Sequence, residues 1–310
     1  MDNGNRQQSI AQLWNPDELV GGLEAVGALG QRLYSNADDT GSVAPSLDGK
    51  ALKQRLHEAK RLLRNGRYED AIALLGEGAV NLYHPGYMSQ QLCAPAAASV
   101  VGDALASLLN QGHAVFSMSP THSLVEDEVL AWAKQRLGLA EDFVGIPTGG
   151  GSLSNLSALL AARNFLSNWR GWRDGAWPKL TVFSTAFSHY SVARAAGMLG
   201  IGVENCLEIE GDRYGRMSVE GLAKSLTRLR DSEPAVVVLT LGNTATGAID
   251  PIADAVAVAR RIRPDVWIHV DAAHGGGLFH LSSLHETFAA LKECDSVSWN
   301  PHKLFFSRFR

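Results

Sequence analysis

An aspartate and a lysine near the end of this 310-residue chain are of the types that could do chemistry together. Asp271 closes the apolar run VWIHV, and Lys303 follows the short run DSVSWNPH. A lysine amine can form an imine, and a carboxylate can face a protonated ring nitrogen; pyridoxal phosphate requires both groups from a protein. An acid and an amine that each follow a strand therefore indicate one site at one edge of a sheet.

The elements that must position these two residues begin near residue 143, where short apolar runs alternate with helical patterns. This rhythm predicts an α/β fold with a mostly parallel sheet covered by helices on both faces. In such sheets ligands bind beyond the carboxyl ends of the strands, so residues at strand ends become candidates for a site. The expected strands are 143–147, 181–185, 204–210, 235–241, 266–270 and 295–299, and the expected helices are 153–167, 190–199, 218–230, 252–262 and 284–293.

The first 80 residues have a different pattern, and we expect them to form an N-terminal helical segment with a linker. Apolar residues recur at helical spacing over 16–34, 51–64 and 69–78, and the polar stretch 35–50 is typical of a linker. Residues 81–310 then form the large domain, which opens with a loop over 84–95 and two helices over 96–110 and 123–137.

A glycine-rich loop, PTGGGSLSN at 147–155, opens directly into a helical pattern. Glycines let the backbone approach a ligand closely, and the free amides of a helix N-terminus favour an anion. Ser152 is placed either to cap this helix or to donate its hydroxyl to a phosphate oxygen. Both an ordinary tight turn and a phosphate loop fit these residues, although the spacing of the two common nucleotide motifs is absent.

Two further strand ends carry polar side chains. His189 follows a strand and begins a helix, where its ring could stack on an aromatic cofactor or form an ordinary loop hydrogen bond. In LTLGNTATGAIDPI, Thr244 or Thr246 could touch a ligand, and Asp250 is expected to initiate the next helix. Taken singly, Asp271 could also cap the following turn and Lys303 could be a solvated surface lysine. The order of all these candidates along successive strand ends favours one shared site.

The motifs GGGSLSNLSALLAAR, SHYSVARAAGMLG, GNTATGAIDPI, HVDAAHGGG and DSVSWNPHK resemble, in this order, those of the group II pyridoxal-phosphate amino-acid decarboxylases. The resemblance implies a fold-type I, aminotransferase-like large domain, pyridoxal 5′-phosphate as cofactor, and a homodimer. It also implies decarboxylation of an L-amino acid to an amine and carbon dioxide through an imine on Lys303, with acidic substrates favoured over aromatic ones. Asn243 and His274 depart from the residues that are frequent in this family.

The resemblance also assigns roles by matching positions. The catalytic residues would be Lys303, which carries the imine, Asp271, which faces the pyridine nitrogen, and His189, which stacks on the ring. The other cofactor-binding residues would be Gly151, Ser152, Asn300 and His302 around the phosphate, with Thr244 and Ala273 along the cofactor.

The composition narrows the class of protein further. The chain is 45% hydrophobic and 19% charged with a net charge of −4, and no basic block suggests nucleic acid as a partner. Cys93, Cys206 and Cys294 are too few and too widely spaced for a disulfide framework or a zinc site, which favours a cytoplasmic protein without a metal. Neither a signal peptide nor an apolar run long enough to span a membrane is expected.

The chain continues after Lys303 only as LFFSRFR, whereas members of the resembled family continue much further. We therefore expect a fragment that lacks the small C-terminal domain, and we assign no role to Arg308 or Arg310. Two alternatives stay open at this point: another fold-type I lyase that uses the same cofactor, or a catalytically inactive, truncated remnant of a decarboxylase.

Overall fold

The computed structural model describes residues 15–35, 43–44, 48–88, 91–175 and 179–305. The chain divides into two compact units, Met1–Gln90 and Gln91–Arg310. The domain boundary that we expect at residues 80–81 stays a prediction. Most of the expected linker, together with Arg308 and Arg310, lies outside the described residues.

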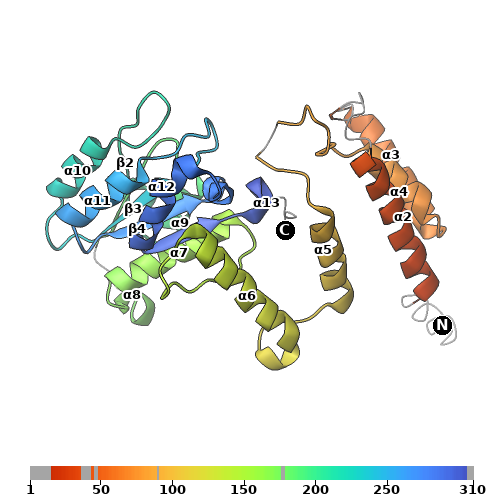
Figure 1. The fold of residues 1–310 in the computed structure, drawn as a ribbon, viewed down its shortest axis with the longest axis horizontal. Coiled ribbons are helices and arrows are strands. Elements are labelled where there is room, and N and C mark those ends of the chain that lie inside the picture. Colours follow the sequence, from red (N-terminus) through yellow and green to blue (C-terminus); the bar gives the residue numbers. More distant parts are fainter. Residues whose placement is uncertain (1–14, 36–42, 45–47, 89–90, 176–178, 306–310) are drawn as a thin grey trace. The chain divides into compact units, whose positions relative to one another are not determined.

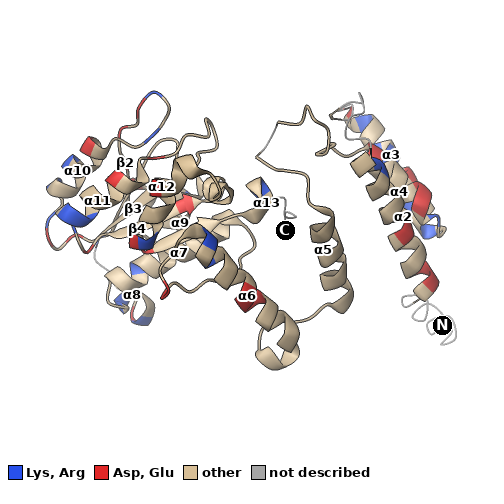
Figure 2. Cartoon of the chain, viewed as in Figure 1, with Lys and Arg blue, Asp and Glu red and all other residues tan. Residues whose placement is uncertain are grey.

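The first unit consists of three helices in its described part (Figure 1), namely α2 (Pro16–Ser35), α3 (Gly49–Arg64) and α4 (Tyr68–Glu77). These helices confirm the three helical patterns of the sequence. The Asp48 side chain caps α3 by accepting from the Lys50 amide at 3.0 Å. Small and aliphatic residues are buried between the helices, and both acidic and basic residues lie on their outer faces (Figure 2).

The second unit is built on a five-stranded sheet in which every neighbouring pair is parallel (Figure 1). The strand order is β2-β1-β3-β4-β5, and β3 and β4 are buried along almost their whole length. The register places Thr240 beside Asp271 and Asp271 beside Ser298, so these strands end at one edge. The strands are β1 (Thr181–Ser184), β2 (Cys206–Glu208), β3 (Ala235–Thr240), β4 (Trp267–Ala272) and β5 (Ser296–Trp299).

The prediction of a strand at 143–147 is wrong, because these residues form no strand. Val144 and Ile146 are 95% and 69% exposed. An apolar, β-branched run becomes a strand only when a neighbouring strand satisfies its backbone, and in the part of the chain that the structure describes no strand pairs with this run.

Helices cover both faces of the sheet, as predicted. On one side α10 (Val219–Arg228) and α11 (Ile252–Ile262) bury aliphatic residues against Val237 and Leu239 of β3. On the other side α7 (Gly151–Leu166) and α9 (Ser191–Met198) pack against Val236 and Val238. Adjacent residues of β3 therefore face opposite cores, which explains its uninterrupted apolar sequence.

The remaining elements complete this unit. The helix expected at 284–293 is only partly correct, because α12 (His285–Ala289) continues as tighter 3₁₀ turns at both ends. The other helices are α5 (Ala97–Leu109), α6 (Pro120–Leu137), α8 (Arg170–Arg173) and α13 (Pro301–Leu304), and the 3₁₀ turns are Phe116–Met118, Val203–Asn205, Gly275–Leu278, Ser282–Leu284 and Ala290–Glu293.

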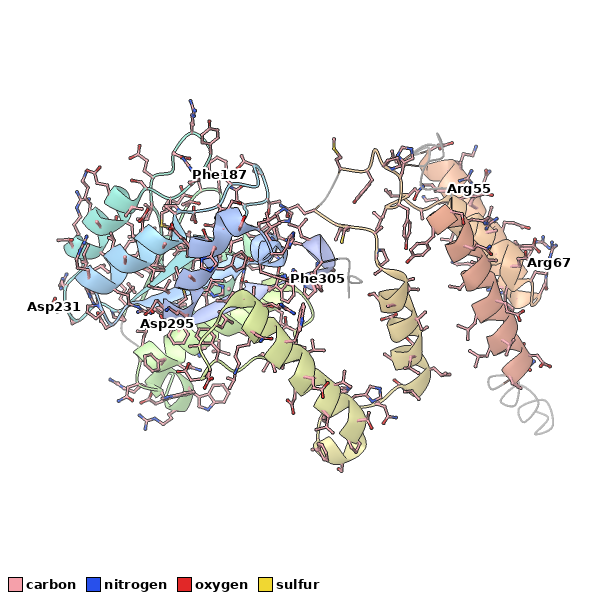
Figure 3. All side chains as sticks on the ribbon, in the orientation of Figure 1. Arg55, Arg67, Phe187, Asp231, Asp295 and Phe305 are labelled. Carbon is pink, nitrogen blue, oxygen red and sulfur yellow. The ribbon has the colours of Figure 1, made fainter. Side chains whose placement is uncertain are left out.

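Aromatic and ionic contacts hold the end of β5 and the short helix α13. Phe305, labelled in Figure 3, packs its ring 5.2 Å from that of Trp132 and 5.7 Å from that of Trp299. Asp295, at the other end of β5 in the same figure, forms an ion pair with Arg260 at 2.7 Å. It also accepts from the Ile268 amide at 2.6 Å. These contacts position the strand that leads to Lys303.

Asp250 has a role other than the helix start predicted for it. The N-cap of α11 is Pro251, and the Asp250 carboxylate instead accepts from the backbone amides of Met217 and Thr240, each at 2.7 Å. It thereby joins the end of β3 to the loop before α10. Burial raises the pKa of Asp250 to about 6, although the two amide donors oppose this shift.

We expect Asp250→Ala to lower the free energy of unfolding by about 1–3 kcal/mol, because two buried amides lose their acceptor. A carboxyl whose pKa is higher in the folded state than the ordinary 3.8 binds its proton more tightly when folded. Its stabilisation is therefore complete below about pH 4 and declines as the pH rises through about 6. Denaturant titrations should show a larger loss at pH 4.5 than at pH 8, with the exposed Asp254→Ala as control. An equal loss at both pH values would contradict the raised pKa.

Candidate functional site

A cavity of about 230 Å³ lies at the carboxyl ends of β3, β4 and β5. It includes every residue to which the resemblance gives a role, whereas Thr246 is not among the residues that line it. Thr246 instead donates to the Tyr214 carbonyl at 2.9 Å. The lining residues are Gly149, Gly150, Gly151, Ser152, Asn155, His189, Tyr190, Thr240, Gly242, Asn243, Thr244, Asp271, Ala273, His274, Asn300, His302 and Lys303.

Asp271 lies near the end of β4, with only 5% of its surface exposed. Its Oδ2 atom accepts from Asn155 Nδ2 at 2.8 Å, and its Oδ1 atom accepts from the Ala273 amide at 3.1 Å. The contact with Ala273 lies in the turn that follows β4, so Asp271 also caps this turn, as one interpretation of the sequence predicted. Because carboxylate oxygens can accept several hydrogen bonds, Asp271 retains the capacity to accept from a ligand in the cavity.

Lys303 belongs to α13, and its side chain reaches the same cavity. Its Nζ donates to Gln91 Oε1 at 3.5 Å, and Gln91 in turn donates to the Asn243 carbonyl at 3.4 Å. Burial lowers the pKa of Lys303, although the charge of Asp271 opposes this effect. The lowered pKa increases the fraction of neutral, nucleophilic amine at a given pH. Lys303 is therefore partly buried in a cavity rather than a solvated surface lysine.

His189 lies immediately before Tyr190, the N-cap residue of α9, and its Nδ1 is 2.7 Å from Ser191 Oγ. Burial lowers the pKa of His189, and the charges of Lys303 and Arg194 lower it further against the opposing effect of Asp271. Burial also lowers the pKa of His274 and of His302, each with a further contribution from Lys303. These shifts favour neutral imidazoles around the cavity at neutral pH.

The glycine-rich loop forms the N-terminus of α7. Gly150 is the N-cap residue with φ 112°, so the capping interpretation of Ser152 is wrong; Ser152 lies in the first helical turn. A side chain at Gly151 would place its Cβ 2.8 Å from Asn300 Nδ2, so any larger residue here would displace the Asn300 amide. The loop therefore brings helix amides, a serine hydroxyl and an asparagine amide to one end of the cavity, an arrangement that suits a phosphate.

Two buried polar atoms beside the cavity are consistent with a polar ligand. Thr240 Oγ1 and His274 Nδ1 have no hydrogen-bond partner among the described residues. Because buried polar groups are generally hydrogen-bonded, a ligand with polar substituents could provide the hydrogen-bond partners that these two atoms lack. Together with the glycine-rich loop, Asp271 and Lys303, these atoms fit pyridoxal phosphate.

The sequence reasoning missed Asn155, Thr240 and Gln91. Asn155 follows Ser152 by one helical turn, which is a signal that could have placed it on the cavity side of α7. Thr240 precedes the strand end at which we expected ligand contacts, and the register with Asp271 reveals its position. The contact between Gln91 and Lys303 links positions that are distant in sequence and has no local signal.

The described residues contain no group of acidic, histidine or cysteine side chains arranged to hold a metal ion. Among these same residues, no helix is long and apolar enough to cross a membrane.

Comparison with families of known proteins adds independent information. Residues 67–310 match the family model described as the pyridoxal-dependent decarboxylase conserved domain. A human acidic amino acid decarboxylase is 32% identical over 74% of this chain and 44% of its own length. The L-2,4-diaminobutyrate decarboxylase of Rhizobium meliloti is 35% identical over 74% of this chain and 45% of its own length.

Two further matches cover nearly the whole chain. A glutamate decarboxylase-like protein of Gibberella zeae is 28% identical over 98% of this chain and 58% of its own length. The crystal structure of mouse CSAD superposes with a TM-score of 0.83 and 25% identity, covering 96% of this chain and 64% of that one. The chain thus spans about half the length of the curated relatives it matches.

Proposed function

Because the chain belongs to the pyridoxal-dependent decarboxylase family, we propose that it takes part in the decarboxylation of an L-amino acid to an amine and carbon dioxide. Pyridoxal 5′-phosphate is the cofactor of this family. One observation carries the proposal: the Lys303 amine and the Asp271 carboxylate line the same cavity as a glycine-rich helix N-terminus. Amine, acid and anion site are the three things that this cofactor requires.

Each residue has a distinct proposed task. Lys303 would hold the cofactor covalently through its neutral amine, with loss of water, and Asp271 would accept a hydrogen bond from the ring nitrogen. The neutral imidazole of His189 would pack on the ring. When bound, the cofactor would supply an electron sink for the pair left by the departing carboxylate. The phosphate would be held by Gly151, Ser152, Asn300 and His302, with Thr244 and Ala273 along the ring.

We propose an acidic amino acid as substrate. The residues of the sequence motifs support this, and so do the names of relatives such as the acidic amino acid decarboxylase. The diaminobutyrate enzyme, which is 35% identical over the same share of this chain, makes a basic amino acid the second class to examine. Two alternatives remain, namely another lyase that uses the same cofactor and a remnant without activity. The experiment below distinguishes both from a decarboxylase.

We also propose that two copies of the chain associate in the cytoplasm. Several large apolar side chains are more than half exposed on α5 and α6, including Val101, Leu108 and Leu124. Exposed apolar surface of this kind is typical of an interface. Three free cysteines support a reducing compartment. The mass of the purified chain in solution tests the association.

The proposed function is tested by adding pyridoxal phosphate to the purified chain and then screening amino acids for carbon dioxide release. We expect a new absorbance band, a cofactor attached to Lys303 after borohydride reduction and digestion, and carbon dioxide release with glutamate, aspartate or cysteine sulfinate. Attachment without carbon dioxide release from any amino acid would favour another lyase or an inactive remnant. Absence of attachment would contradict the proposal.

A further inference from the structure

A buried network of side chains lies behind the cavity and converges on Asn155, which is only 1% exposed. Its Nδ2 atom donates to Asp271 Oδ2 at 2.8 Å and to Ser191 Oγ at 2.9 Å. The NH₂ group of Asn155 therefore donates one hydrogen to Asp271, which is proposed to face the cofactor ring, and the other to Ser191, which contacts His189.

The opposite side of the amide is equally well satisfied. Asn155 Oδ1 accepts from Ser298 Oγ at 2.8 Å and lies 3.1 Å from His269 Nε2. Because the Asp271 carboxylate offers acceptors, the NH₂ group of Asn155 must face it and the oxygen must face His269 and Ser298. The chemistry of its neighbours therefore determines the orientation of the amide.

The tautomer of His269 follows from its contact with Asn155. Asn155 Oδ1 can only accept, so the proton of the neutral His269 ring lies on Nε2, which faces that oxygen. His269 Nδ1 then accepts from Ser296 Oγ at 2.9 Å, and Ser296 Oγ in turn accepts from Trp267 Nε1 at 2.9 Å. Burial lowers the pKa of His269, in agreement with a neutral ring.

The same reasoning reaches His189 through Ser191. Ser191 Oγ accepts from Asn155 and lies 2.7 Å from His189 Nδ1. The Ser191 backbone amide donates to the same nitrogen at 3.3 Å. His189 Nδ1 is therefore an acceptor, and the proton of the neutral ring lies on Nε2.

We propose that Asn155 is a positioning residue, which through one amide orients both the Asp271 carboxylate and the His189 ring for the cofactor. This inference rests on the proposed function, because it concerns how the chain's own groups are held for pyridoxal phosphate. In metal sites, removing a group that orients a ligand side chain typically lowers affinity or activity about 10- to 100-fold, and we expect an effect of this size here. Asn155 acts on two such side chains at once.

The test compares Asn155→Ala and Asn155→Asp with a matched control, Asn164→Ala. Asn164 is a buried asparagine of the same helix, and its side-chain oxygen accepts from Arg163 rather than from a cavity residue. Each protein is titrated with pyridoxal phosphate by absorbance, and circular dichroism of the bound cofactor reports its orientation. Thermal unfolding without cofactor measures any purely structural effect.

We expect Asn155→Ala to weaken pyridoxal phosphate binding about 10- to 100-fold and to alter the circular dichroism of the bound cofactor. Asn155→Asp, which keeps the size of the side chain and an acceptor for Ser298, should do the same, because it replaces a donor to Asp271 with another acid. Asn164→Ala should bind the cofactor as the unmodified chain does. Ser191→Ala should alter the dichroism while weakening binding less, because it interrupts only the connection to His189.

The outcomes separate the two levels of inference. If the unmodified chain does not attach pyridoxal phosphate to Lys303, the proposed function fails. If it does, and either folded Asn155 variant binds the cofactor with unchanged affinity and dichroism, the positioning role of Asn155 is overturned. If Asn155→Ala does not fold, the same measurements on Asn155→Asp decide. Loss of the fold in both variants would assign Asn155 to stability instead and would also overturn the proposal.

Discussion

Lys303→Ala is expected to abolish covalent attachment of pyridoxal phosphate and to lower amine production by on the order of 10⁴-fold or more. Lys303 lines the cavity, and burial lowers its pKa. The lower pKa favours the neutral, nucleophilic amine. Alanine has no amine with which the cofactor aldehyde could react. Mass spectrometry after borohydride reduction measures the attachment, and amine release measures the activity.

Two controls define what this result would mean. Lys303→Arg retains a positive charge in the cavity but offers a guanidinium that does not form the covalent link, so it should behave as the alanine variant does. Lys292→Ala removes an exposed lysine elsewhere in the same unit and should leave attachment intact. A reduced adduct still found on Lys303→Ala would assign the cofactor to a different amine and contradict the site.

Asp271→Asn is expected to leave the cofactor attached to Lys303 but to lower turnover by on the order of 10²–10³-fold. The substitution keeps the shape of the side chain beside Asn155 and Ala273 while removing the negative charge. The ring nitrogen then loses the anion that would hold its proton, and the cofactor becomes a weaker electron sink. Rates of carbon dioxide release, together with the absorbance of the bound cofactor, measure both parts of this expectation.

The Asp271→Glu variant is the matched comparison, because it keeps the charge but moves it by one methylene. We expect partial activity from it, between that of the unmodified chain and that of Asp271→Asn. Asp254→Asn, at an exposed position of α11, should have no effect on turnover. Full turnover by Asp271→Asn would show that the carboxylate does not serve the ring nitrogen.

Much of the second unit was predictable because its signals are local. The continuous apolar run of β3 reflects a strand that is buried on both faces of a parallel sheet. The helical spacing of apolar residues in α11 reflects a helix that buries one face. The failures arose where a local pattern lacked its partner. The run at 143–147 has strand composition, but no strand pairs with it among the described residues. Asp250 precedes a helix, but its carboxylate accepts from two distant amides.

The sequence by itself determined which residues are the candidates for the chemistry. Asp271 and Lys303 were recognisable because each follows a strand, and the parallel sheet brings strand ends to one edge. Only the tertiary structure decided what surrounds them. Asn155 reaches Asp271 across 116 residues of sequence, and Gln91 reaches Lys303 across 212. Such contacts depend on how helices and strands pack, and no local periodicity encodes the direction in which a buried amide points.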